Sequence, residues 1–229
     1  MATHPSLKSP YLTLILIRHA ESWGNRWGRM EGHTSTALTR RGCQQARRLR
    51  AYLRQQSPPQ VCYTSPTLRT AQTAAMLCAP DAQGQIVSLQ TDPALQEIHP
   101  GIFQGLTWAE ATVHYPHLCQ QLCNQLTLVP IPQAESPHDA RQRADHWLTH
   151  CLRQHQPGET VWGVSHSGIL QHLVGAVLGC DRTWQIQIPH TALFEFWLSQ
   201  PSDLTVDGLN PERWKIKQFN DCPHLDSSL

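Results

Sequence analysis

Charge is scarce in this chain. Charged residues make up 15% of its 229 residues and the formal net charge is +1, against a usual charged share of about 25%. A chain with so little net charge has no overall field to hold nucleic acid or an anionic membrane surface, so we expect neither as a partner. Any anion-binding site must be built locally. Hydrophobic residues make up 40%, which suits a folded core and argues against disorder.

Long apolar runs and closely paired cysteines are also missing. No apolar stretch reaches the roughly eighteen residues that a transmembrane helix needs. The apolar run at 12–17 is too short for a signal peptide and is followed by Arg18 and His19, not by a small-residue cleavage site. The eight cysteines include no C-x-x-C pair, which favours free thiols in a reducing compartment. The sequence therefore predicts a cytoplasmic protein.

The signatures of several enzyme classes are absent. There is no H-E-x-x-H, no dense acidic cluster, no G-x-x-x-x-G-K-[ST] and no G-x-G-x-x-G, so we expect neither a metal nor another cofactor. The segment G-V-S-H-S at 163–167 has serine where the G-x-S-x-G turn of serine hydrolases requires glycine. A serine hydrolase is therefore not favoured.

Strand-like apolar segments alternate with helix-like amphipathic segments along the chain. Strands are predicted at 12–17, 60–64, 86–89, 160–165, 192–198 and 213–219, and helices at 41–56, 66–78, 107–115, 138–155 and 168–178. The alternation predicts an α/β fold, a three-layer sandwich with a mostly parallel central sheet flanked by helices.

The length suits one domain. We expect residues 1–10 to form a flexible N-terminal arm and residues 11–229 to form that domain. The stretch at about 91–137 is irregular and rich in Pro, Gln and His. It is predicted to be a small inserted lid, because long irregular segments inside compact domains often cover active sites.

Two predicted strands run directly into a histidine. His19 follows the first strand beside Arg18, and His166 follows the strand at 160–165. Functional groups gather at the carboxyl ends of parallel strands, so the two histidines are predicted to face each other across one cleft. The alternative is that each histidine merely ends a strand, but this is less expected for two such strands than for one.

Two further segments carry groups that suit an anion site. The segment S-P-T-L-R-T at 65–70 leads from a strand into a helix, whose N-terminus can seat an anion. Arg69 lies one turn into that helix and could reach the same anion, although a surface ion pair is the alternative. Glu97 stands just before the irregular stretch and, considered alone, is more typical of a solvated loop acid.

These groups together fit phosphoryl chemistry without a metal. Two arginines and two histidines could hold a phosphate dianion, and a neutral imidazole is a competent nucleophile toward phosphorus. Neighbouring guanidinium groups disfavour imidazolium and keep that nucleophile unprotonated. A carboxyl group near the leaving oxygen could protonate it and later activate water, and Glu97 has the chemistry for this role.

The order of motifs resembles the histidine phosphatase family, in its phosphoglycerate-mutase-like form. That family opens with R-H-G-E-[ST]-x-x-N after a strand, and its remaining motifs have counterparts here in the same order from residue 12 to 225. The matching segments are R-H-A-E-S-W-G-N (18–25), G-R-M-E-G (28–32), L-T-R-R-G-C-Q-Q-A (38–46), S-P-T-L-R-T-A-Q-T-A (65–74), L-Q-E (95–97), A-E-S (134–136), S-H-S-G (165–168) and F-N-D-C-P-H-L (219–225).

The resemblance implies a phosphoglycerate-mutase-like fold and a role for each matching residue. His19 would be the phosphorylated nucleophile and Glu97 the proton donor, with a phosphate pocket completed by Arg18, Arg69 and His166. The positions that line the substrate site in relatives are occupied here by Asn25, Glu31, Gly32, Ser167 and Gly168. Ala20 and Ser167 stand where relatives have glycine.

The family contains both mutases and phosphatases, and one absence separates them here. No Lys or Arg occurs between Arg69 and Arg141, a stretch that covers the substrate in this family. A mutase must hold a second phosphate, for which cations are the efficient groups. We therefore predict a metal-independent phosphomonoesterase that binds a small phosphorylated metabolite or inorganic phosphate, as a monomer or homodimer. The alternatives are phosphoglycerate-mutase-type transfer and, less expected, a non-catalytic regulator that binds a phosphorylated metabolite.

Three tryptophans lie close to the motif residues in sequence. Trp23, Trp27 and Trp108 could present an apolar wall to the leaving group. The alternative, which we favour, is that they pack in the core or lid.

Overall fold

The computed structural model describes residues 9–56, 58–80, 84, 86–125, 129–180, 186–199 and 214–225. Most of the predicted arm at 1–10 and the start of the predicted strand at 213–219 lie outside these residues.

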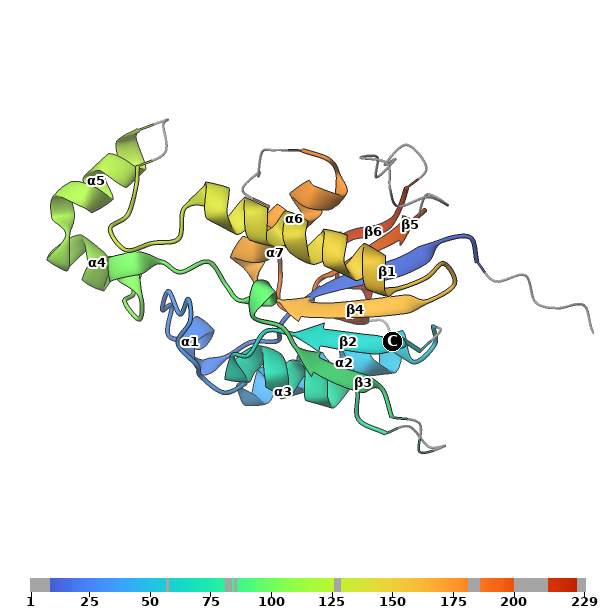
Figure 1. The fold of residues 1–229 in the computed structure, drawn as a ribbon. Coiled ribbons are helices and arrows are strands. Elements are labelled where there is room, and N and C mark those ends of the chain that lie inside the picture. The colour runs from blue at the N-terminus through green and yellow to red at the C-terminus, as the bar shows by residue number, and fades with distance from the viewer. Residues whose placement is uncertain are drawn as a thin grey trace, which may run out of the picture.

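A six-stranded sheet forms the centre of the molecule, in the order β3-β2-β4-β1-β5-β6 (Figure 1). β4 pairs in parallel with both β1 and β2, and β2 pairs in parallel with β3. β5 is antiparallel to β1 and to β6, so it is the one strand of the sheet that runs against the others. The prediction of a mostly parallel sheet is confirmed. The strands are β1 (Leu12–Arg18), β2 (Val61–Thr64), β3 (Ser88–Thr91), β4 (Thr160–Ser165), β5 (Leu193–Leu198) and β6 (Lys215–Asp221).

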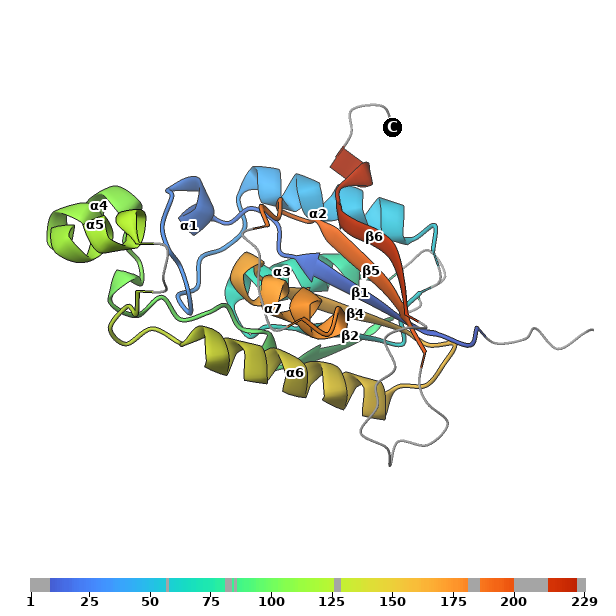
Figure 2. The same cartoon turned by 90° about the horizontal axis from the view of Figure 1, so that it is seen from above.

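Helices cover both faces of this sheet (Figure 2). α2 and α3 pack together on one face, and α6 and α7 pack together on the other. The three-layer α/β sandwich is therefore confirmed. The α-helices are α1 (Trp23–Arg26), α2 (Arg40–Leu53), α3 (Leu68–Leu77), α4 (Trp108–His114), α5 (Pro116–Asn124), α6 (Pro137–Gln154) and α7 (Ser167–Val177).

The apolar run of β1 is explained by its central position. Leu14 and Leu16 belong to the core cluster that α6 and α7 cover, whereas Ile15 and Ile17 belong to the cluster under α2 and α3. Successive side chains of a strand point to opposite faces, so a strand covered on both faces reads as a continuous apolar run. The same burial fixes the register that delivers Arg18 and His19 to the end of the sheet.

Local differences from the sequence prediction have simple causes. The third strand lies at Ser88–Thr91, not at 86–89, and all four of its residues are exposed, so this edge strand has no buried pattern by which to place it. α1 was missed because it has only four residues, held by a capping box between Ser22 and Asn25. α5 was missed because it begins directly at Pro116 after α4.

The segment at 91–137 forms a small layer at one end of the molecule. It contains two 3₁₀ turns, η1 (Pro93–Leu95) and η2 (Gly101–Phe103), followed by α4 and α5. Figures 1 and 2 both place α4 and α5 away from the sheet, on the side to which β1, β2 and β4 point. The segment at 91–137 has an apolar cluster of its own, built on Phe103, Ala111 and Cys119.

A substitution at Gly42 tests how closely α2 packs on the chain that follows β1. A Cβ at this position would come within 2.1 Å of the carbonyl oxygen of Glu21, which is backbone and cannot move away easily. We expect Gly42→Ala to lower the free energy of unfolding by about 1–3 kcal/mol, the usual cost of overpacking. Urea unfolding measures this loss of unfolding free energy. Gln44→Ala, at an exposed position of the same helix, should stay within about 0.5 kcal/mol of wild type; equal losses in both variants would contradict this packing.

Candidate active site

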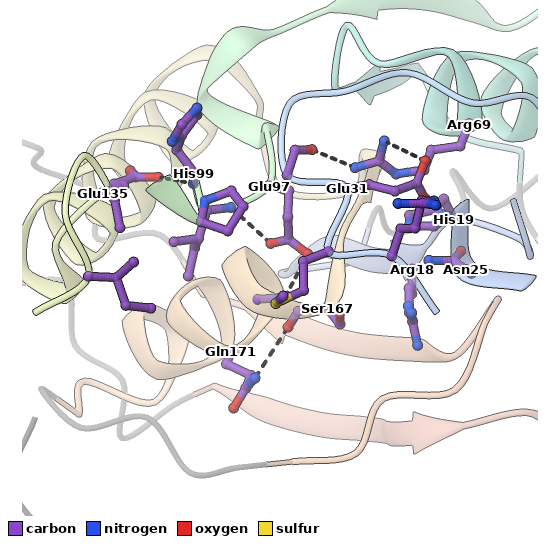
Figure 3. Close-up of a pocket in the computed structure, with 18 residues that line it drawn as sticks. Arg18, His19, Asn25, Glu31, Arg69, Glu97, His99, Glu135, Ser167 and Gln171 are labelled. Atoms are coloured by element: carbon purple, nitrogen blue, oxygen red, sulfur yellow. Dashed lines mark hydrogen bonds and ion pairs between the residues drawn. The ribbon is translucent and has the colours of Figure 1, made fainter. Parts of the chain in front are cut away.

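A cleft of about 520 Å³ lies at the end of the sheet where β1 and β4 finish. Of the residues predicted for the site, all but His166 line it, and the ring centroid of His166 is 5.0 Å from that of His19. The structure thus brings together every residue of the predicted site. Figure 3 shows Arg18, His19, Asn25 and Arg69 on one side of the cleft, with Glu97 and Ser167 next to them.

Paired strand ends explain why the two histidines meet. Arg18 of β1 pairs with Ser165 of β4, and the backbone N–H of His19 donates a 2.9 Å hydrogen bond to the carbonyl oxygen of Ser165. The residue after each strand is therefore a neighbour across the ladder. The predicted meeting of His19 and His166 across one cleft agrees with this geometry.

His19 presents a defined nitrogen to the cleft. Its Nδ1 lies 2.8 Å from the carbonyl oxygen of Ala20. A carbonyl oxygen only accepts, so Nδ1 carries the proton and Nε2 is left with its lone pair. The residue is 3% exposed, and burial holds the pKa of His19 well below 6.5, with further lowering by the neighbouring His166 and Arg18. An unprotonated Nε2 is the form that can act as a nucleophile.

His166 is fully buried beside it. Its Nε2 lies 2.9 Å from Oγ of Ser65, and its Nδ1 is buried with no hydrogen-bond partner within the described part of the chain. Burial first, and then the charge of Arg69, holds the pKa of His166 well below its usual value. An unpartnered buried nitrogen next to a cleft is costly unless a bound group completes it.

Arg69 is a buried residue and not the surface ion pair considered as its alternative. It is 1% exposed and donates to the carbonyl oxygens of Thr34 (2.6 Å) and Gly32 (2.7 Å). Oε1 of Glu31 lies 3.7 Å from Nη1 of Arg69. The carbonyls of the loop that follows α1 thus fix this guanidinium group.

Arg18 provides the second guanidinium group. It donates to the carbonyl oxygen of Ile188, and the Nε atoms of both Arg18 and Arg69 are buried and have no partner among the described residues. Burial lowers the pKa of each arginine, and the charge of Arg69 lowers that of Arg18 further. Two partly desolvated cations with unused donors form a strong seat for an anion.

The predicted anion seat at the N-terminus of α3 is not found. No residue from 65 to 68 lines the cleft. The backbone N–H of Leu68 instead donates to Oγ of Ser35 (2.6 Å), and that of Thr67 donates to Oγ of Ser65 (3.4 Å). Arg69 itself, and not the start of its helix, supplies the donors of the site.

Glu97 is anchored on the N-terminus of α7. Its Oε2 accepts from the backbone N–H of Gly168 (3.1 Å), and its Oε1 accepts from those of Ile169 (3.0 Å) and Ile98 (2.9 Å). A Cβ on Gly168 would approach Oε1 to 2.5 Å, so a larger residue here would push the Glu97 carboxylate out of this position. Ser167, which replaces a glycine of the family motif, lines the cleft without this conflict.

Glu31 and Asn25 act within one hydrogen-bonded network. Oε2 of Glu31 accepts from Ser22 Oγ (2.5 Å) and Oε1 accepts from Thr36 Oγ1 (2.6 Å). Oδ1 of Asn25 accepts from the backbone N–H of Ser22 (3.1 Å) and lies 3.0 Å from Nε2 of His190. These contacts orient Asn25 so that its oxygen is occupied and its amide nitrogen is the remaining donor.

His190 is a site residue that sequence reasoning missed. Its ring centroid lies 5.9 Å from that of His19, and burial, followed by the charge of Arg18, lowers its pKa to about 3. It precedes β5, and because β5 is antiparallel to β1, the start of β5 lies at the same edge as the end of β1. Only the sheet order could have pointed to it. Residues that line the cleft directly and were also missed are Arg29, Met30, Ile98, His99, Pro100, Ile131, Ala134, Glu135 and Gln171.

The three tryptophans near the motifs do not line this cleft. Trp23, Trp27 and Trp108 are 44%, 56% and 46% exposed, so they are neither an apolar wall for the leaving group nor part of the buried core. The favoured alternative of packing in the lid holds for Trp108, whose ring centroid lies 6.3 Å from that of Phe103 in the segment at 91–137. Among the described residues, His, Cys, Asp and Glu side chains form no group of three or more suited to a metal ion. None of the described helices has the length and hydropathy of a bilayer-spanning segment.

The layer arrangement and the site define a phosphoglycerate-mutase-like α/β protein. The sequence model of the histidine phosphatase superfamily (branch 1) matches residues 14–221. The chain belongs to this superfamily.

Relatives and solved structures agree with this assignment. The chain is 27% identical over 219 residues to the phosphoglycerate mutase-like protein 4 of Arabidopsis thaliana, covering 95% of this chain and 89% of the relative. It is 26% identical over 222 residues to the metal-independent phosphoserine phosphatase of the same plant, covering 96% and 86%. Among solved structures, Bacillus stearothermophilus YhfR superposes with a TM-score of 0.76 at 26% identity, covering 93% and 98%. The family and its phosphatase relatives support a phosphatase activity.

Burial of neutral histidines in the site predicts how stability depends on pH. A histidine whose folded pKa lies below 6.5 binds fewer protons folded than unfolded, so stability falls as the pH drops below 6.5. With its pKa at about 3, His190 alone should cost about 2 kcal/mol of unfolding free energy between pH 7 and pH 5. Urea unfolding in phosphate-free buffer should show a smaller loss for His190→Asn than for wild type.

The control for this measurement is an exposed histidine. His117 lies on the surface of α5, and His117→Asn should keep the wild-type dependence on pH. If His190→Asn and wild type lost stability equally between pH 7 and pH 5, the neutral state of His190 would be wrong.

Proposed function

We propose that this protein is a metal-independent phosphomonoesterase that forms a phosphohistidine on His19, with Glu97 as its proton donor. The observation that carries the proposal is the group of two buried, unprotonated imidazoles with one buried and one half-buried guanidinium group, both with an unused Nε donor, around one cleft. Such a group holds a phosphate dianion without a metal and presents a nucleophile to it.

The reaction follows in two steps. Nε2 of His19 attacks phosphorus, the bond between phosphorus and the ester oxygen breaks, and that oxygen takes a proton from the Glu97 carboxyl group. Water then attacks the phosphohistidine, gives its proton to the Glu97 carboxylate, and phosphate leaves with the bond to His19 broken. The sum is ester plus water to alcohol plus phosphate, and Glu97 returns to its starting state.

The remaining site residues stabilise the transferred group. Arg18, Arg69 and His166 face the three non-bridging oxygens, on which negative charge is spread in the transition state. Asn25 adds its amide donor. Their positions are set in advance by hydrogen bonds to backbone carbonyls and to Ser65, so little reorganisation is needed when charge develops.

Hydrolysis is favoured over mutase-type transfer because the cation that could hold a second phosphate is already paired with a carboxylate. Arg29 is the one cation that the cleft offers beyond Arg18 and Arg69 among the described residues. Its Nη1 and Nη2 lie 3.0 Å and 3.4 Å from the carboxylate of Glu110, and Nη1 also donates to the carbonyl of Gly105. A second phosphate would have to compete with Glu110 for this guanidinium group. A purely regulatory phosphate-binding protein would not need both histidines and Glu97.

Two wider predictions remain part of this proposal. The segment at 91–137 would serve as the lid, because it supplies Ile98, His99 and Ile131 to the cleft. Free thiols at Cys43, Cys62, Cys78, Cys119, Cys123, Cys151 and Cys180 support the predicted cytoplasmic location.

Removal of the nucleophile tests the proposal. With p-nitrophenyl phosphate in EDTA, we expect wild type to release phosphate and His19→Ala to lose at least about 10³-fold in kcat, as expected for loss of a nucleophile. The acid-labile, base-stable phosphohistidine that rapid quenching traps on wild type should also be absent from His19→Ala. Activity that survives in His19→Ala, or that requires added magnesium, would refute the mechanism.

The role of Glu97 is tested by the leaving group. An alkoxide must be protonated as it departs, whereas p-nitrophenolate leaves readily without a proton. We therefore expect Glu97→Gln to lower kcat/KM for an alkyl phosphate by about 10²–10⁴-fold, the usual contribution of general acid catalysis, with a much smaller loss for p-nitrophenyl phosphate. Equal losses for both esters would indicate that Glu97 only positions groups.

A further inference from the structure

The cleft has two chemically different halves. One half carries the cations and imidazoles that hold phosphate. The other half, beyond Glu97, is where the leaving group must lie, and Figure 3 shows His99 and Glu135 there, away from Arg18 and Arg69. We call this half the leaving-group wall and define it by the lining residues Met30, Ile98, Pro100, Ile131, Ala134 and Glu135. Five of these six residues have no charged or hydrogen-bonding side chain.

The charged groups near the leaving-group wall are already paired. Oε1 and Oε2 of Glu135 accept from Nε (2.9 Å) and Nη2 (2.8 Å) of Arg143. Nη1 of Arg143 donates to the carbonyls of Ala94 and Gln96, both at 2.8 Å. Four of the five N–H donors of Arg143 are therefore committed and its charge is paired with Glu135. The other nearby cation, Arg29, is paired with Glu110.

His99 offers no positive charge either. The backbone N–H of Gly101 donates a 3.0 Å hydrogen bond to Nδ1 of His99. A backbone N–H only donates, so Nδ1 carries no proton and the ring is neutral. Gln171, one turn into α7, also lines this side of the cleft, and its polar side chain is uncharged.

We propose that the substrate is a phosphate monoester of an uncharged alcohol with an apolar face. A carboxylate or second phosphate on the leaving group would give up hydration against an apolar wall without a free cation to compensate, and would approach the carboxylate of Glu135. A neutral leaving group loses little and gains apolar contact. This inference rests on the proposed function and narrows it to one class of substrate.

Matched pairs of esters test the inference. One pair is glycerol 3-phosphate and 3-phosphoglycerate, which differ by a hydroxymethyl group in place of a carboxylate. The other is 4-(carboxymethyl)phenyl phosphate and its primary amide, which have nearly the same shape, and in which the methylene group insulates the reacting oxygen from the charge. We expect kcat/KM to be at least about tenfold higher for the uncharged member of each pair, because an unpaired charge is costly to desolvate.

A variant locates the effect in the cleft. Gln171→Lys places a cation on this side at a helix position that is already polar, and Gln171→Met is the uncharged control of similar length. We expect the lysine variant to raise the relative kcat/KM of the charged esters about fivefold, the gain from one partly exposed ion pair, and the methionine variant to leave the ratio within about twofold of wild type.

The outcomes separate the inference from the function on which it rests. If the charged member of both pairs is hydrolysed as well as its partner, to within fivefold, the inference is wrong while the phosphatase proposal stands. If Gln171→Lys and Gln171→Met show the same ratio, the leaving group does not lie on this side and the inference is also wrong. If neither these esters nor p-nitrophenyl phosphate is hydrolysed, the proposed function fails and the inference fails with it.

Discussion

The structure depends on holding two guanidinium groups and two imidazoles together with little access to water. Arg18 and Arg69 repel each other, and burial lowers the pKa of both. Carbonyl oxygens of Gly32, Thr34 and Ile188 accept from them, and the charge of Glu31 opposes the lowering of the Arg69 pKa. The cations therefore remain charged, whereas His19 and His166, which lose their protons far more easily, are held neutral by the same surroundings.

The loop at 29–34 joins the two halves of the cleft. Its carbonyls at Gly32 and Thr34 hold Arg69, and its Met30 exchanges backbone hydrogen bonds with the outer segment, donating to Leu106 (2.8 Å) and accepting from Gly105 (2.9 Å). Gly32 has φ = 50°, a left-handed conformation that glycine adopts without strain. One short loop thus fixes the phosphate-holding guanidinium relative to the leaving-group wall.

Much of the fold and of the site was predictable, for identifiable reasons. His19 and His166 follow strands buried on both faces, and such strands are readable as continuous apolar runs whose carboxyl ends meet. Arg69 was predicted from its place one turn into a helix that follows a strand. Glu97, considered alone, is more typical of a solvated loop acid, and its predicted role came from the chemistry of the other groups and from the motif resemblance. What the sequence could not show is which way a polar group turns: the N–H groups at the start of α3 face Ser35 and Ser65, and Trp23 faces outward. His190 needed knowledge of the antiparallel strand, a contact between segments far apart in the chain.

Some features leave a pattern in the sequence, whereas others depend on contacts that only the folded chain makes. This difference explains why the reaction chemistry is easier to predict here than the substrate specificity. Phosphate has one shape and charge, so the groups that hold it recur at strand ends and helix starts that leave a motif. The leaving group meets side chains of the loop at 29–34 and of the segment at 91–137, where Met30, Ile98 and Ile131 carry no pattern beyond being apolar. Their meaning emerges only when the nearby cations are seen to be committed to Glu110 and Glu135. Specificity in this cleft is therefore a matter of which charges remain unpaired, and that is a property of the folded molecule.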